Sequence, residues 1–244
     1  MRYSLLVPSD PERDGEAALW LASFTEKPTA TKTTFPLDAF STNRDGFPLE
    51  LGPGRLSDRE ARGERWQLHL EGPERPFLHA PRAVGALRLS RTQVAVTKPA
   101  LVVSGSVDGY ELAGALGQQA HVWGTRHALG WCWAHATLAR DRWFEALAAK
   151  VPRLPWLAFH ATEAGRLRIR VGGSAAPGPW RIGAYTVEGA KEDFVGVTYL
   201  DPDGTPAYCW HTEHARLRGP DLDVDGVALE FGSRAKLDGW PLSI

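Results

Sequence analysis

Proline and glycine punctuate the first hundred residues so densely that a long helix cannot form there. Prolines recur between Pro28 and Pro99, with glycines between them. Because proline lacks a backbone donor and clashes with the preceding helical turn, this spacing divides the segment into short pieces. Four pieces alternate apolar and polar residues, as half-buried strands do: 66–70, 86–90, 93–96 and 100–107. The pattern predicts an all-β protein with mainly antiparallel sheets.

The middle of the chain, residues 110–139, contains no proline and predicts two longer strands joined near residues 128–130. In the second strand, alternation places Trp131, Trp133 and His135 on one face and small residues on the other. One face is therefore bulky with polar tips, whereas the other suits close packing against a second layer.

Residues 142–150 form the one segment with a clear helical pattern, because Asp141 is a suitable N-cap and Pro152 ends the run. A chain of 244 residues is long enough for two domains of ordinary size. We expect the helix to connect two β domains, residues 1–139 and 140–244. Further strands are predicted on both sides of a turn at 201–204: 155–162, 166–171, 180–187, 194–200, 207–217 and 227–231.

Net charge is −1, and acidic and basic residues are mixed along the whole chain. The sequence therefore lacks the basic stripe that nucleic acid binding requires. The apolar patch at residues 5–7 is too short for a signal peptide or a membrane span, so we expect a cytoplasmic protein. Cys132 and Cys209 lie far apart in alternating runs and predict buried free thiols. The sequence leaves the oligomeric state open.

Ten tryptophans and eight histidines are the unusual feature of the composition, and many of them lie between residues 121 and 135. On a strand, His121 and Trp123 share a face, so an imidazole stands beside an indole. Imidazole titrates near neutral pH and an indole face attracts positive charge, which suits proton donation beside a cation-stabilising ring. The alternative is an aromatic core in which each histidine satisfies a backbone carbonyl.

A second aromatic and histidine cluster occupies residues 208–214, where alternation again separates two faces. One face carries Tyr208, Trp210, Thr212 and His214. If that face points inward, its side chains form a second aromatic wall, like the one that residues 121–135 would form, and the two walls would line an apolar pocket. If the opposite face does, Glu213 can orient or recharge the imidazole of His211. A surface ion pair between Glu213 and an arginine such as Arg216 is the plainer alternative.

These patterns define the candidate site. The candidate catalytic residues are His121, Glu213 and His214. The candidate ligand-binding residues are Trp123, Arg126, His127, Trp131, Trp133, His135, Tyr208 and Trp210. We expect no metal, because HExxH and paired cysteines are absent and His211 and His214 fall on opposite strand faces. We expect no cofactor either, because the glycine-rich stretches lack the strand-then-helix context of a dinucleotide site.

Residues 117–127, GQQAHVWGTRH, followed by a spaced Trp-x-Trp and a His, resemble the G-x-x-(D)-H-x-W-G-x-R signature of a lipocalin-like superfamily. That superfamily includes carotenoid 1,2-hydratase, tocopherol cyclase, AttH-like proteins and fungal Diels–Alderases. The resemblance implies two lipocalin-like β barrels side by side, with an apolar pocket near their junction. It also implies that His121, Trp123 and Arg126 line or support that pocket. Ala120 stands where many members have Asp, so an activity in which that carboxylate supplies the proton would not carry over.

The leading functional hypothesis is a cofactor-independent enzyme that acts on a hydrophobic polyene, isoprenoid or polyketide-like molecule by cyclisation, isomerisation or hydration. His121 would donate the proton or anchor the substrate, and Arg126 would hold the strand pair or a substrate carbonyl. The second hypothesis is a non-catalytic lipocalin-like binder or carrier of such a molecule, which Ala120 favours. A structural protein with tryptophan in its core is the third. The sequence leaves open whether any catalysis occurs.

Overall fold

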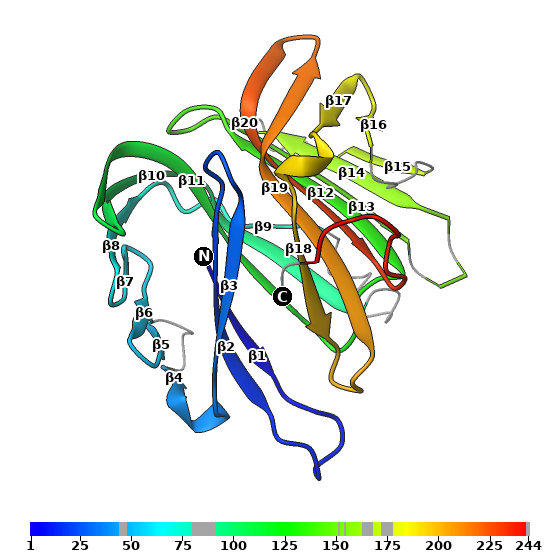
Figure 1. Cartoon of the computed structure of the whole chain (residues 1–244). Coiled ribbons are helices and arrows are strands. Elements are labelled where there is room, and N and C mark those ends of the chain that lie inside the picture. The colour runs from blue at the N-terminus through cyan, green and yellow to red at the C-terminus, as the bar shows by residue number, and fades with distance from the viewer. Residues whose placement is uncertain are drawn as a thin grey trace.

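β-Strands make up most of the computed structural model (Figure 1), which describes residues 1–43, 48–79, 91–150, 152–153, 155–162, 168–171 and 178–242. The strands form three antiparallel sheets, which we call A, B and C. Sheet A contains β1 (Arg2–Leu6), β2 (Glu16–Ser23) and β3 (Thr29–Phe35), paired in that order.

Sheet B follows the order β11-β10-β8-β7-β6-β5-β4, and β9 also pairs with β10. The short 3-10 helix η1 (Leu37–Ala39) leads into this sheet. Its strands are β4 (Phe40–Thr42), β5 (Leu49–Leu51), β6 (Gly54–Leu56), β7 (Glu60–Arg62), β8 (Trp66–Glu71), β9 (Phe77–Leu78), β10 (Thr92–Val107) and β11 (Tyr110–Gly124).

Sheet C follows the order β15-β14-β13-β12-β20-β19-β17-β16, and β18 also pairs with β19. The 3-10 helix η2 (Lys191–Asp193) precedes β18. Its strands are β12 (Gly130–Thr137), β13 (Trp143–Lys150), β14 (Leu157–Thr162), β15 (Arg168–Val171), β16 (Trp180–Ile182), β17 (Tyr185–Glu188), β18 (Val195–Leu200), β19 (Pro206–Gly219) and β20 (Leu222–Ser233).

Sheet A lies between the two larger sheets, and Figure 1 shows β1–β3 in blue between them. One face of β2 packs into the core of sheet B through Ala17 and Leu19. The opposite face packs against sheet C through Ala18 and Trp20. Because successive side chains of a strand point to opposite sides, a single strand contributes to both cores.

Sheet C also encloses a core of its own on its inner face. Small and aromatic residues fill it, among them Cys132, Ala134, Trp180, Trp210 and Phe231. Cys132 and Cys209 are both buried free thiols, as predicted. Burial raises the pKa of each thiol well above its usual range, so neither is a reactive thiolate at neutral pH.

The predicted all-β, mainly antiparallel fold is confirmed, with two large barrel-like sheets. The run at 66–70 lies in β8, and the turn at 201–204 joins β18 to β19 in a hairpin. The predicted strand at 86–90 lies outside the described residues. The chain passes from sheet B to sheet C at residues 125–129, ahead of the predicted division after residue 139.

The predicted connecting helix over residues 142–150 is wrong, because this segment forms strand β13. It pairs with β12 along one edge and with β14 along the other. Phe144 and Ala146 enter the core of sheet C, whereas Trp143 and Glu145 are buried on the opposite face. Alanine and leucine favour a helix in isolation, but two neighbouring strands and two buried faces outweigh that local preference.

No helix in the described part of the chain is long and apolar enough to cross a membrane.

Gly105 of β10 approaches the backbone of β8 so closely that a side chain does not fit. Its φ is +122°, and an added Cβ would lie 2.0 Å from the carbonyl oxygen of Gln67. We expect Gly105→Ala to lower the free energy of unfolding by about 3 kcal/mol through backbone strain and overpacking. Gly109→Ala is the control, because its φ is also positive but nothing lies within 4 Å of an added Cβ. It should cost about 1 kcal/mol, and equal losses in urea denaturation would argue against the close contact.

Candidate functional site

The face of sheet C that is turned away from its own core carries a band of buried and half-buried ionisable side chains. We call it the junction face, because sheets A and B pack against it. Strand register places Trp133 of β12, Glu230 of β20 and His211 of β19 side by side. The same register places His135 of β12 opposite Glu145 of β13. Residues far apart in the chain therefore form two adjacent rows on one face, since cross-strand neighbours share a face.

Glu145 is the most enclosed of these groups, with 1% of its surface exposed. Its Oε1 accepts hydrogen bonds from His79 Nε2 and from Trp133 Nε1, the second at 2.5 Å. Its Oε2 accepts one from His135 Nδ1 at 2.5 Å. Burial alone would raise the pKa of Glu145, but His79 and His135 together lower it to about 2. The carboxylate is therefore ionised at neutral pH.

Hydrogen-bond geometry determines the protonation of His135. Its Nε2 lies 3.0 Å from Thr137 Oγ1, and that hydroxyl donates its single proton to the carbonyl oxygen of Gly117 at 2.9 Å. The hydroxyl must therefore accept a proton from Nε2, while Nδ1 donates to Glu145. With both ring nitrogens donating, His135 is an imidazolium whose charge balances that of the carboxylate.

His79 is then the neutral member of the cluster, because a second buried cation would be uncompensated. Its Nε2–H donates to Glu145, so its Nδ1 carries the lone pair. His79 is 2% exposed, and its Nδ1 has no hydrogen-bond partner in the described part of the chain. Leaving a buried polar atom unpaired costs about 1–3 kcal/mol. Such an atom marks a candidate binding point for a ligand.

His211 lies between two carboxylates farther along the junction face. Its Nε2 is 2.8 Å from Glu213 Oε1, and its Nδ1 is 3.6 Å from Glu230 Oε2. Burial would lower the pKa of His211, but the two carboxylates raise it to about 9. Burial would likewise raise the pKa of Glu230, but hydrogen bonds from His211 and from Trp131 Nε1 lower it to about 2. His211 and Glu230 are therefore charged partners at neutral pH.

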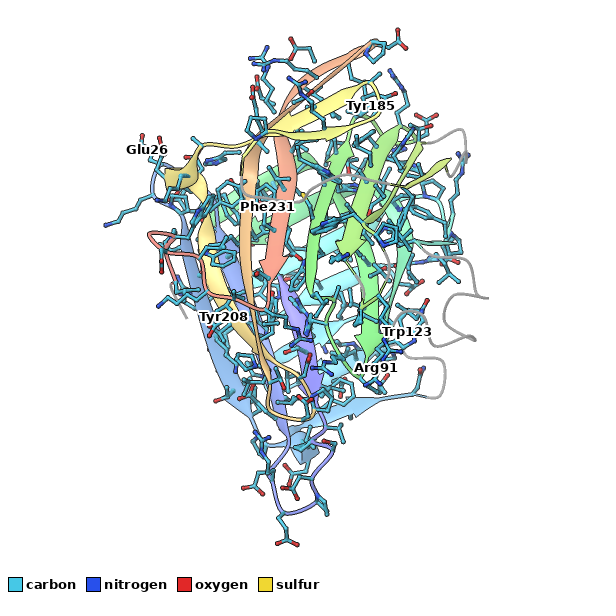
Figure 2. The ribbon with its side chains drawn as sticks, turned by 90° about the vertical axis from the view of Figure 1, so that its right-hand side faces the viewer. Glu26, Arg91, Trp123, Tyr185, Tyr208 and Phe231 are labelled. Carbon is cyan, nitrogen blue, oxygen red and sulfur yellow. The ribbon has the colours of Figure 1, made fainter. Side chains whose placement is uncertain are left out.

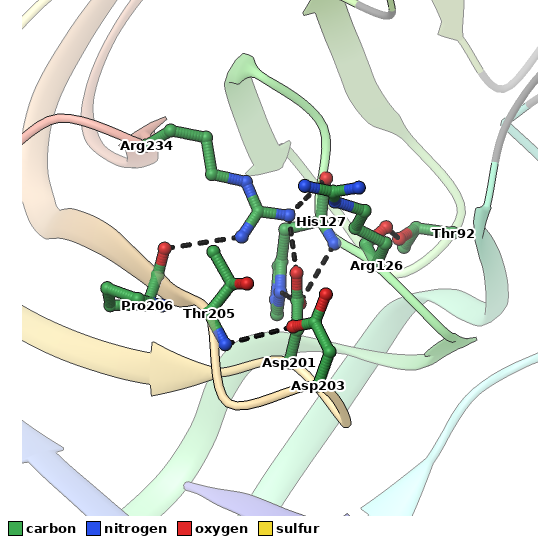
Figure 3. A network of polar contacts seen from close by, with 8 residues as sticks. All are labelled: Thr92, Arg126, His127, Asp201, Asp203, Thr205, Pro206 and Arg234. Atoms are coloured by element: carbon green, nitrogen blue, oxygen red, sulfur yellow. Dashed lines mark hydrogen bonds and ion pairs between the residues drawn. The ribbon is translucent and has the colours of Figure 1, made fainter. Parts of the chain in front are cut away.

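His127 ties the loop between sheets B and C to the β18–β19 turn (Figure 3). Asp201 Oδ1 accepts hydrogen bonds from the backbone N–H of His127 at 3.0 Å and from its Nδ1 at 2.6 Å. Asp201 Oδ2 accepts one from Arg234 Nη2 at 2.5 Å. The His127 ring stacks on Trp131 and on Tyr199, and burial lowers its pKa. These contacts fix the loop that leads into β12.

Part of the predicted site does come together on the junction face: Trp131, Trp133, His135 and, stacked on the first of them, His127. Glu213 contacts His211, which is the alternative in which a carboxylate orients an imidazole. Arg216 instead pairs with Asp223, with Nε and Oδ1 2.7 Å apart.

Two other predicted residues of β19, Tyr208 and Trp210, lie away from the junction face. Tyr208 and Trp210 pack against or within the core of sheet C, and the Trp210 Nε1–H donates to the carbonyl oxygen of Pro241 at 2.8 Å. His214 lies within a bulge of β19, and its Nε2–H donates to the carbonyl oxygen of Phe24 at 2.7 Å. The Phe24 ring contacts both His214 and His211. The donors of Trp210 and His214 are therefore used in contacts with distant parts of the chain.

His121, Trp123 and Arg126 are exposed at the end of β11 and in the loop that follows. The rings of His121 and Trp123 do stack, with centroids 5.1 Å apart. Figure 2 shows Trp123 beside Arg91 and well apart from Phe231. The roles predicted for these three residues remain predictions, because they do not join the cluster around Glu145.

His79, Glu145 and Glu230 are candidates that no sequence motif identifies. Glu145 does leave one signal, since it is the single charged residue between Trp143 and Ala149. The apparent helix hides that signal, because only a two-residue period places Glu145 on the same face as Trp143. His79 approaches Glu145 through a contact between sheets, which sequence spacing does not encode.

Two open recesses lie along sheet B, and charged side chains line both: Arg55, Asp58, Arg59 and Glu60 in one, and Glu64, Arg65 and Asp108 in the other. Neither has the apolar lining of the predicted pocket, which remains a prediction. Over the described ranges, His, Cys, Asp and Glu side chains do not form a group of three suited to a metal ion.

No protein-family model matches the chain. Two uncharacterized proteins of Mycobacterium tuberculosis, Rv0493c of strain H37Rv and MT0513 of strain CDC 1551, are each 28% identical to it over 223 residues. The match covers 76% of this chain and 65% of each relative, so the chain spans less than two thirds of their length.

A solved structure provides the comparison at the level of the fold. The crystal structure of a Nitrosomonas europaea protein provisionally assigned as an AttH superposes with a TM-score of 0.60 at 12% sequence identity. The match covers 96% of this chain and 87% of that one. The chain therefore shares the double-barrel fold of an AttH-like protein.

Proposed function

We propose that the protein is a cofactor-independent enzyme that moves a proton on a hydrophobic small molecule, with His79 as the base. The observation that carries this proposal is the pairing of His79 with Glu145. The carboxylate holds Nε2–H, so the Nδ1 lone pair has a fixed direction, as in catalytic pairs of a carboxylate and an imidazole. His135 balances the carboxylate charge and so keeps His79 neutral, which leaves the Nδ1 lone pair of His79 free to accept a proton from a substrate.

The surroundings of His79 favour an apolar substrate. Its ring contacts Phe77 and Phe159, with centroids 5.8 Å and 5.5 Å away. A polyene, isoprenoid or polyketide-like molecule can pack against such rings while one of its acidic hydrogens faces Nδ1. Transfer of that proton to His79, and its return at another atom of the substrate, gives cyclisation or isomerisation.

Turnover by His79→Gln over a panel of polyenes, isoprenoids and cyclisable polyketides tests this proposal. We expect a loss of about 10²-fold or more relative to the wild type, the size usual for removing a general base, with little change in melting temperature. His69→Gln is the control, because His69 is an exposed histidine of β8. Turnover that is the same in the wild type and in His79→Gln would contradict the proposal.

A non-catalytic binder or carrier is the second candidate. The burial of Glu145 favours a binder, because a carboxylate that is held by three donors also holds the His79 ring rigidly in place. In a binder, His79 Nδ1 only accepts a hydrogen bond from the ligand. His79→Gln would then weaken binding by about 1 kcal/mol, measured by saturable quenching of tryptophan emission, and the wild type would turn over no member of the panel.

A further inference from the structure

A second buried polar atom near His79 also lacks a partner. The Nε1–H of Trp143 finds no hydrogen-bond acceptor among the described residues, although Trp143 is only 4% exposed. An indole N–H is a donor only, whereas His79 Nδ1, with the proton held at Nε2, is an acceptor only. The two unpaired atoms therefore have complementary requirements.

The two atoms belong to one small region of the junction face. Trp143 and Glu145 lie two residues apart on the same face of β13, which corresponds to about 7 Å along a strand. His79 is hydrogen-bonded to Glu145. Phe77 stacks on Trp143 with centroids 4.8 Å apart and planes 8° apart, and it also contacts His79 at 5.8 Å. The donor and the acceptor thus flank a single aromatic ring.

We propose that the substrate of this site is an enolisable carbonyl compound, whose oxygen accepts a hydrogen bond from Trp143 Nε1–H while its α-hydrogen faces His79 Nδ1. This inference rests on the proposed role of His79 as a base. A hydrocarbon polyene would leave both buried atoms without partners. A carbonyl compound satisfies the indole donor and places its most acidic C–H beside the lone pair.

The proton transfer balances without any further reactant. His79 Nδ1 takes the α-hydrogen as a proton, and the C–H electron pair forms the C=C bond of an enolate. The C=O π pair moves onto oxygen, where the Trp143 N–H stabilises the negative charge as a donor in an oxyanion site does. The imidazolium of His79 then returns the proton to oxygen, to give the enol, or to a conjugated carbon, to give an isomer.

Exchange of α-hydrogens for deuterium in 4-phenylbutan-2-one, followed by NMR in D₂O, tests the inference. We expect the wild type to accelerate exchange and Trp143→Phe to reduce that rate by about 10–100-fold, because phenylalanine keeps the ring but removes the N–H. The melting temperature of Trp143→Phe should equal or exceed that of the wild type, since it loses an unpaired donor. Trp66→Phe, in the separate core of sheet B, should leave exchange unchanged.

A measurement on the wild type keeps the test independent of how the variant folds. Saturation with the ketone should move the Trp143 indole N–H resonance downfield, and no movement would overturn the inference. Exchange that depends on His79 but not on Trp143 would overturn it while leaving the proposed function intact. If the enzyme turns over polyenes in a His79-dependent way but exchanges no ketone, the inference is likewise overturned and the proposed function stands. Lack of any His79 dependence would overturn both.

Discussion

Glu145→Gln should lower the free energy of unfolding by about 3–5 kcal/mol at pH 7, the cost of removing one partner from a buried ion pair. The amide can still accept hydrogen bonds from His79 and Trp133 at one atom. At the other atom it presents N–H to His135 Nδ1–H, so two donors face each other. The imidazolium of His135 also loses the charge that balances it. Urea denaturation monitored by tryptophan emission measures the loss.

Two further variants, compared with Glu145→Gln, separate the effect of the buried charge of Glu145 from other effects of the substitution. Glu50→Gln changes an exposed glutamate whose carboxylate is 3.5 Å from Arg55, and should cost less than about 1 kcal/mol. The triple variant that places leucine at residues 79, 135 and 145 removes every charge of the cluster at once. It should be more stable than Glu145→Gln despite its three substitutions, because a buried ionic cluster can be replaced by apolar residues at little cost. A triple variant less stable than Glu145→Gln would contradict this account of the cluster.

Stability should be greatest between about pH 4.5 and pH 6.5 and should fall on both sides. Glu145 and Glu230 have a pKa of about 2 in the folded protein instead of 4.5, so their stabilisation is complete above pH 4.5 and is lost toward pH 2. For each glutamate, this difference in pKa corresponds to about 3 kcal/mol in the free energy of unfolding. His211 has a raised pKa of about 9, so its stabilisation is complete below pH 6.5 and is lost as the pH rises through 9.

Urea midpoints at pH 3, 5.5, 7 and 9.5 test this profile. The attraction between His211 and Glu230 is lost at either extreme, so Glu230→Gln should flatten both the acid and the alkaline arms. Glu145→Gln should flatten only the acid arm, because the pKa of Glu145 is lowered by His79 and His135 and not by His211. A wild-type midpoint that stays constant from pH 3 to pH 9.5 would rule out this linkage.

Local patterns in the sequence are enough to predict the strands and several of their faces. Alternation correctly separates Trp131, Trp133 and His135 from the small residues that enter the core of sheet C. It also correctly places His211 and Glu213 on a common face. These predictions succeed because a strand period depends only on neighbouring residues.

The composition of the cluster could not be predicted in the same way, because long-range register and tertiary pairing create it. Glu145 meets His135 through the pairing of β13 with β12, and a local preference for helix concealed that pairing. His79 reaches Glu145 from another sheet, 66 residues earlier in the chain. His121 and Trp123 share a face as predicted, but the alternation does not tell whether that face is buried.

The position of β2 between two cores has a consequence for how the molecule assembles. The ribosome releases β1–β3 before any strand of sheet C has been made, so Ala18 and Trp20 have no surface to pack against during most of synthesis. Their counterparts Trp131 and Cys209 come much later in the chain. Such distant contacts make folding slow, because a long loop must close before they are formed. Each half leaves part of its apolar surface uncovered without the other, so the two halves should lose their structure in one cooperative step.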